Sequence, residues 1–289
     1  MADVSSAQTA QLMDEAGFLA QWQAHGLHAR APRDAAYEGG LLADQLAWVF
    51  VAGYQAAMRS VFPEVHSEGW LAFAVSEDRE HPEQYPPLTA QADESEWLLS
   101  GCKSWVAQSA QVSELVVSAR LRERTELFRV ASNIKGLTLS HRPEPGFLSA
   151  MSQGFARFDD SPAARLDEPE RRKWFMNAEA LAMMLAASGY LKRVTPAENA
   201  AGQAAVQAMG ACVPRLGDLL EALAAGEPPA ADELLSLDER WHTGLEQWLA
   251  AVETAAIPAF EADRSLLTLY RAAIRKQAQR AAITVSEQP

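Results

Sequence analysis

The residue types that most often carry chemistry are sparse in this sequence and rarely stand at the spacing that a site needs. The six histidines include one close pair, His25-x-x-His28, without further ligands at metal-binding spacing. Ser152-Gln153-Gly154 and Ser188-Gly189 lack the pattern of a nucleophile elbow. No glycine-rich phosphate loop of the Rossmann or Walker kind occurs. The sequence therefore predicts no metal site, no nucleophile-elbow hydrolase site and no phosphate-binding loop for a nucleotide.

The densest local pattern lies in residues 69–120 and has the rhythm of antiparallel strands. Short apolar runs with β-branched or aromatic residues alternate with polar turns. These predicted strands are Trp70–Val75, Trp97–Leu99, Trp105–Val106, Glu114–Ala119 and Glu126–Val130. Their spacing favours a small barrel or sandwich.

This stretch resembles the middle β-domain of the acyl-CoA dehydrogenase family. The matching segments, in order, are Ala72–Glu77 (AFAVSE), Leu99–Ala107 (LSGCKSWVA), Ile134–Leu137 (IKGL) and Phe158–Ala163 (FDDSPA). The resemblance implies an α+β multidomain fold with a shortened N-terminal helical lobe at 1–68, a flavin-facing antiparallel β-barrel or sandwich at 69–168, and a C-terminal helical bundle at 169–289.

The resemblance also implies FAD as cofactor. By motif position, Ser76 lies at the pyrimidine side of the flavin, Trp105 packs on the ring, and Ala107 stands where a threonine hydroxyl commonly reaches the flavin N5. Trp105 and the Val106–Gln108 backbone offer the flat apolar surface and the donors that such a ring needs. The family's Gly-Ser-Asp turn is replaced within Asp78–Tyr85 (DREHPEQY), and Ala107 lacks the hydroxyl. We therefore expect FAD binding that is weak or lost.

Glu179 is the candidate catalytic base. The family oxidises the CH–CH bond of an acyl-CoA thioester by moving an α-proton to a glutamate. The usual C-terminal base loop is missing here, but some members place the glutamate early in the helix after the β-domain, about ten residues before a glycine. Glu179 followed by Gly189 matches that spacing, although Ala180 replaces the usual arginine. The alternative is an ordinary glutamate on the surface of a helix.

Composition and charge limit the partners. The chain has 289 residues, 48% hydrophobic, and a net charge of −13. That charge argues against nucleic acid, whose phosphates need clustered Lys and Arg. The one basic run comprises Arg271, Arg275, Lys276 and Arg280. A solvated helix face explains it, and a phosphate of CoA or FAD is the alternative.

Cysteine usage and hydropathy favour a cytoplasmic protein. Cys102 and Cys212 lie 110 residues apart, and the N-terminus lacks the pattern of a secretory signal, so we expect free thiols. No apolar run reaches the length of a membrane span.

The remaining segments have helical periodicity. Predicted helices cover Ala7–Gln23, Leu41–Val61 after a break at Gly39-Gly40, Trp174–Leu191, Asn199–Ala225, a helix capped by Ser236–Glu239, and Ser265–Ala282. The last four suggest an up-and-down bundle.

Three functions remain open. The first is an acyl-CoA dehydrogenase-type oxidoreductase. The second is a degenerate family member that acts as a binding or assembly partner, as a homodimer or with a full-length relative. The third keeps flavin with changed chemistry, because an open flavin site favours reaction with oxygen.

Overall fold

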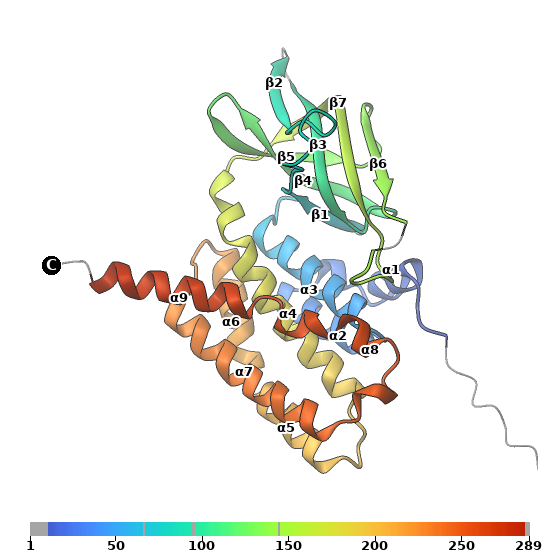
Figure 1. The fold of residues 1–289 in the computed structure, drawn as a ribbon, viewed down its shortest axis with the longest axis vertical. Coiled ribbons are helices and arrows are strands. Elements are labelled where there is room, and N and C mark those ends of the chain that lie inside the picture. Colours follow the sequence, from blue (N-terminus) through green and yellow to red (C-terminus); the bar gives the residue numbers. More distant parts are fainter. Residues whose placement is uncertain (1–10, 66, 94–95, 144, 287–289) are drawn as a thin grey trace, which may run out of the picture.

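The computed structural model describes residues 11–65, 67–93, 96–143 and 145–286, and its chain forms a sheet that stands on a lobe of helices (Figure 1). Helices from the beginning of the chain come first, seven strands follow within the described residues, and the remaining helices complete the lobe. This arrangement confirms the α+β class. Among the described residues, no helix is long and apolar enough to cross a membrane.

The N-terminal helices are α1 (Glu15–Ala24), α2 (Pro32–Leu42) and α3 (Leu46–Val61), with a 3-10 turn at Leu27–Ala29. Asp14 caps α1 by accepting a 2.7 Å hydrogen bond from the Gly17 N–H. The helix predicted at Ala7–Gln23 therefore begins later, and residues 7–10 lie outside the described part. Every residue of α3 except Arg59 is buried, since the helix lies inside the lobe.

The strands are β1 (Trp70–Ala74), β2 (Thr89–Asp93), β3 (Glu96–Ala107), β4 (Val112–Leu121), β5 (Arg124–Ala131), β6 (Leu137–His141) and β7 (Gln153–Arg165). Most pairs are antiparallel, but β1 lies parallel to β4. The purely antiparallel prediction is wrong there, because the β2–β3 hairpin reverses the chain twice before β4. The barrel or sandwich arrangement stays a prediction.

The two short strands predicted at Trp97–Leu99 and Trp105–Val106 are parts of one strand, β3. The chain continues as one strand through Gly101, whose φ of +130° is open to glycine and strained for other residues. The pairing of β3 with β7 shifts register on both sides of Cys102 and Lys103. The register shifts and Gly101 interrupt the alternation of apolar and polar residues, and the sequence pattern therefore predicts two strands instead of one.

The C-terminal helices are α4 (Phe175–Val194), α5 (Ala200–Gly210), α6 (Val213–Ala224), α7 (Ala231–Ala251), the short α8 (Phe260–Asp263) and α9 (Arg271–Ser286). 3-10 turns cover Pro169–Lys173, Thr254–Ala256 and Arg264–Thr268. The single helix predicted at Asn199–Ala225 is therefore two, because Pro214 has no N–H to continue the preceding helix. The predicted start at Ser265 falls in a 3-10 turn.

The capping box predicted at Ser236–Glu239 is wrong, because these residues lie inside α7. Asp238 is 1% exposed and faces His242 one turn later. Burial of Asp238 against other helices thus outweighs the local capping preference of its sequence.

Two hydrophobic cores hold the fold together. The larger joins α1–α3 to α4–α9, so the two helical segments share one interior. The smaller lies within the sheet. Cys102 and Cys212 are buried and free, as expected. The division at residues 68 and 168 stays a prediction.

The break predicted at Gly39-Gly40 is also wrong, because both glycines lie inside α2, where Gly39 faces Ala52 and Trp22 and Gly40 faces α4. A Cβ on Gly40 would stand 1.9 Å from the carbonyl oxygen of Ala186, and one on Gly189 would stand 2.2 Å from that of Tyr37. The two helices therefore meet backbone to backbone.

We expect Gly40→Ala and Gly189→Ala to lower the free energy of unfolding by about 1–3 kcal/mol each, because overpacking forces the helices apart. Gly210→Ala is the control, since a Cβ there meets nothing within 4 Å. It should be neutral or slightly stabilising. Urea unfolding midpoints measure this, and wild-type stability of Gly40→Ala would contradict the close approach.

Candidate functional site

Glu179 lies in the second turn of α4 and is partly buried. Burial raises the pKa of its carboxyl group to about 7, while a hydrogen bond from the Tyr270 hydroxyl opposes that rise. The pKa of Tyr270 is raised well above its ordinary value, mainly by burial and further by the charge of Glu179. A carboxyl group that titrates near neutral pH in a largely dry place has the properties of a general base.

Tyr54 of α3 links Glu179 to the sheet. Its hydroxyl oxygen accepts a 2.6 Å hydrogen bond from the Phe73 N–H of β1. Its ring meets the Trp105 ring edge-on at 6.3 Å and the Phe175 ring of α4 at 5.7 Å. Burial raises the pKa of Tyr54, and the charge of Glu179 raises it further. Tyr54 thus stands within electrostatic reach of Glu179 and in ring contact with Trp105.

Ser76 and Trp105 lie beside each other at the end of β1. The Ser104 N–H, next to Trp105, donates a 2.9 Å hydrogen bond to the Ser76 carbonyl. Ser76 is exposed and Trp105 partly exposed, and the neighbouring Val75 is 41% exposed. The Trp105 Nε1–H donates to Gln153 Oε1 at 3.1 Å, which fixes the ring. A half-covered indole, an apolar neighbour and a hydroxyl are together the surface that a flavin ring fits.

Val106 and Ala107 lie deeper than Ser76 and Trp105. Both side chains are 0% exposed, and both residues pair with β7. They support Trp105 from within the sheet, and direct contact with a flavin stays a prediction. Gln108, which follows, has a left-handed φ of 56°, and its buried Nε2 has no hydrogen-bond partner among the described residues.

The turn at Asp78 does not fit a diphosphate. Its carboxylate accepts hydrogen bonds from the N–H groups of Glu80 at 2.8 Å and His81 at 3.0 Å. These bonds lower the pKa of Asp78 and keep it charged. Backbone N–H groups of this kind hold phosphates in other proteins, but here the Asp78 carboxylate already accepts their hydrogen bonds. The residues present therefore fit the ring of FAD better than its diphosphate.

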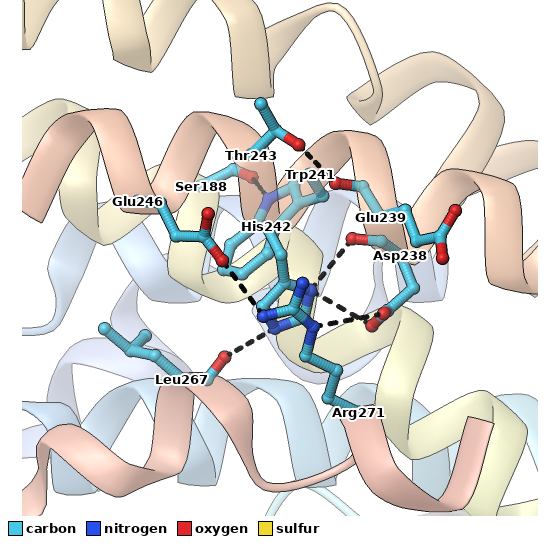
Figure 2. A network of polar contacts seen from close by, with 9 residues as sticks. All are labelled: Ser188, Asp238, Glu239, Trp241, His242, Thr243, Glu246, Leu267 and Arg271. Carbon is cyan, nitrogen blue, oxygen red and sulfur yellow. Dashed lines mark hydrogen bonds and ion pairs between the residues drawn. The ribbon is translucent and has the colours of Figure 1, made fainter. Parts of the chain in front are cut away.

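A buried network fixes the segment that carries Tyr270 (Figure 2). His242 Nε2 lies 3.1 Å from the Leu267 carbonyl oxygen, and its Nδ1 lies 3.1 Å from Asp238 Oδ1. Arg271 reaches Glu246 Oε1 at 3.1 Å. Since these contacts tie residues 267–271 to α7, they position the Tyr270 hydroxyl.

α7 is in turn bonded to α4. The Trp241 Nε1–H donates to Ser188 Oγ at 2.9 Å. Glu179 and Tyr270 are therefore held by one continuous set of polar contacts and packed helices.

Sequence reasoning placed Glu179, Ser76 and Trp105 but missed Tyr54 and Tyr270. Tyr54 fits the helical period of a buried stripe, and Tyr270 lies in a segment without a motif. Their roles arise from contacts between helices distant in sequence. No local signal identifies such contacts.

Neither a protein-family profile nor a curated protein sequence matches the chain. Solved structures do match. FkbI, described for biosynthesis of the methoxymalonyl extender unit of the polyketide Fk520, superposes with a TM-score of 0.64 at 12% identity, covering 89% of this chain and 87% of that one. PigA with FAD and proline gives 0.63 at 13% identity, over 91% and 89%.

The prolyl acyl carrier protein oxidase AnaB gives a TM-score of 0.56 at 15% identity, over 96% of this chain and 92% of its own. At these identities the likeness concerns the fold, which extends over nearly all of each chain. The chain therefore has the fold that the resemblance to the acyl-CoA dehydrogenases predicts.

Proposed function

We propose that the protein is an FAD-dependent oxidoreductase that removes two hydrogens from the CH–CH bond of an acyl thioester. The observation that supports the proposal is the position of Tyr54. Its ring contacts Trp105, which we propose to pack on the flavin, and it lies close enough to Glu179 for that charge to raise the pKa of Tyr54. A flavin surface and a desolvated base thus adjoin. The neighbour PigA was solved with FAD, which supports the cofactor.

The chain's own residues supply binding and proton transfer. Glu179, once ionised, takes the α-proton of the thioester. Tyr270 donates a hydrogen bond to that carboxylate and limits its basicity. Ser76 and Trp105 orient the ring, with Val106 and Ala107 behind them. Bound FAD supplies the chemistry of accepting the hydride from the β-carbon.

Two carriers of the acyl group suit this chemistry. One is coenzyme A, as in the family that the sequence resembles. The other is a carrier protein, since the structural neighbour AnaB is an oxidase of a prolyl acyl carrier protein. We infer a cytoplasmic protein that forms a homodimer or pairs with a full-length relative.

A second candidate function is a family member without redox chemistry that serves as a binding or assembly partner. The Asp78 turn favours it, because a carboxylate occupies donors of the kind that hold a diphosphate. This candidate predicts a stably folded protein that retains no flavin.

Replacing Trp105 tests the cofactor surface. Trp105→Ala should weaken FAD binding by about tenfold or more, since the aromatic face is lost. Trp97→Ala is the matched control, because Trp97 lies on the same strand but packs on Phe128 within the sheet. Titration of flavin fluorescence measures the affinity. Equal losses in both variants, or no FAD binding by the wild type, would favour the second candidate.

Glu179→Gln should lower kcat by about 10³-fold while FAD stays bound, because the amide cannot accept the proton. Glu198→Gln, a similar change at an exposed residue of the helical lobe, should leave kcat unchanged. Anaerobic bleaching of the flavin by acyl thioesters gives the rate. A wild-type rate of bleaching in the Glu179→Gln variant would remove Glu179 from the mechanism.

The dependence of kcat/KM on pH measures the ionisation of Glu179 and the effect of Tyr270 on it. Because the base must be ionised, kcat/KM should rise with pH through an apparent pKa of about 7. Tyr270→Phe removes a bond that lowers this pKa, so the rising limb should move to higher pH. A limb left in place, or moved down, would show that Tyr270 does not tune the base.

A further inference from the structure

We propose that the groove between the start of α4 and α9 docks an acidic acyl carrier protein, which delivers its thioester to Glu179; this inference rests on the proposed function. The groove has a volume of about 330 Å³. Its lining residues are Lys173, Met176, Asn177, Ala273, Lys276, Gln277 and Arg280.

The charge of the groove is opposite to that of the molecule. Three lining residues are cationic and none is acidic, in a chain with a net charge of −13. Lys173 pairs with Glu170 at the rim. Lys276 is exposed and forms no ion pair within the described part of the chain. A concentrated positive patch on the surface attracts an acidic partner.

An apolar residue lies among these charges. Met176 is 40% exposed, one of three large hydrophobic residues that the described surface leaves uncovered. Protein interfaces commonly combine an apolar centre with a charged rim, and methionine adapts its shape to a partner. Met176 among lysines has that composition, which a site for a small phosphorylated molecule alone does not need.

The groove also contains polar atoms that lack partners. Asn177 is 5% exposed, and its Oδ1 has no hydrogen bond among the described residues. Gln277 Oε1 is buried and similarly unbonded. Buried acceptors of this kind are costly unless a donor reaches them. The amide N–H groups of a phosphopantetheine arm, with its phosphate nearer the lysines, are donors of the required type.

The groove lies about one helical turn from the candidate base. Met176 stands three residues before Glu179 on the same face of α4, and Ala273 stands three residues after Tyr270. At 1.5 Å per helical residue, both are within about one turn of the Glu179–Tyr270 hydrogen bond. Figure 1 shows α9 projecting beyond the helical lobe, and its Lys276 and Arg280 are exposed. An arm that enters beside Met176 would follow the face of α4 that carries Glu179.

The test measures docking without turnover. A fluorescently labelled acidic acyl carrier protein with its phosphopantetheine arm is titrated with the full chain, without added FAD or acyl group. We expect saturable binding that weakens with salt. Lys276→Glu should weaken it about tenfold. Met176→Ala should weaken it and Met176→Leu should restore it.

Three controls complete the experiment. Lys135→Glu makes the same charge change at an exposed residue in the turn between β5 and β6, and this variant should bind like the wild type. The carrier protein without its arm should bind more weakly than the complete one. Coenzyme A is the third probe, because it carries the same arm without the protein.

Unchanged carrier binding by Lys276→Glu would overturn the proposal. So would binding of coenzyme A alone with no saturable carrier binding. Because no step uses flavin or Glu179, docking that succeeds in a protein without redox activity would leave this proposal standing and reject only the dehydrogenase function.

Discussion

The contact of α2 with α4 is the constraint on which the candidate site depends. Gly40 and Gly189 bring the two helix backbones together, and Gly53 of α3 also lies against α4, since a Cβ there would stand 3.0 Å from the Met183 Cα. α4 therefore packs closely against two helices. Its axis and rotation are fixed, and with them the position of Glu179. Close packing of this kind tolerates little displacement.

Desolvation gives this rigid arrangement its chemical character. Tyr54, Phe73, Phe175 and Trp105 fill the junction of sheet and helices with aromatic rings. The same exclusion of water raises the pKa of Tyr54 and that of Glu179. Tyr54 is left a neutral hydrogen-bonding group, whereas Glu179 becomes a base that titrates near pH 7. Exclusion of water thus keeps Tyr54 neutral and makes the neighbouring Glu179 a base.

Local patterns predicted the parts of the fold that depend on local periodicity. β1, β4, β5 and α4 were found because alternation or helical spacing lies within one segment. The glycine pair in α2 was misread as a break, since both glycines are needed only when the neighbouring helices are in place: Gly39 faces Ala52 and Trp22, and Gly40 faces α4. The Ser236–Glu239 segment was misread as a cap for a similar reason, because Asp238 turns inward to His242. Tyr270 was missed because its partner lies 91 residues earlier in the chain.

The basic residues near the C-terminus look alike in sequence but differ in burial and in their partners. Arg271 turns toward α7, where it pairs with Glu246 and lies 3.9 Å from Asp238. Lys276, little more than one turn later, stays exposed in the groove. Attraction between exposed charges extends over about 8 Å in physiological salt, while proton transfer requires contact. Recruitment of an anionic partner and abstraction of a proton therefore belong to different residues, and the pairing of α4 with the segment from Tyr270 to α9 brings both sets to one edge of the helical lobe.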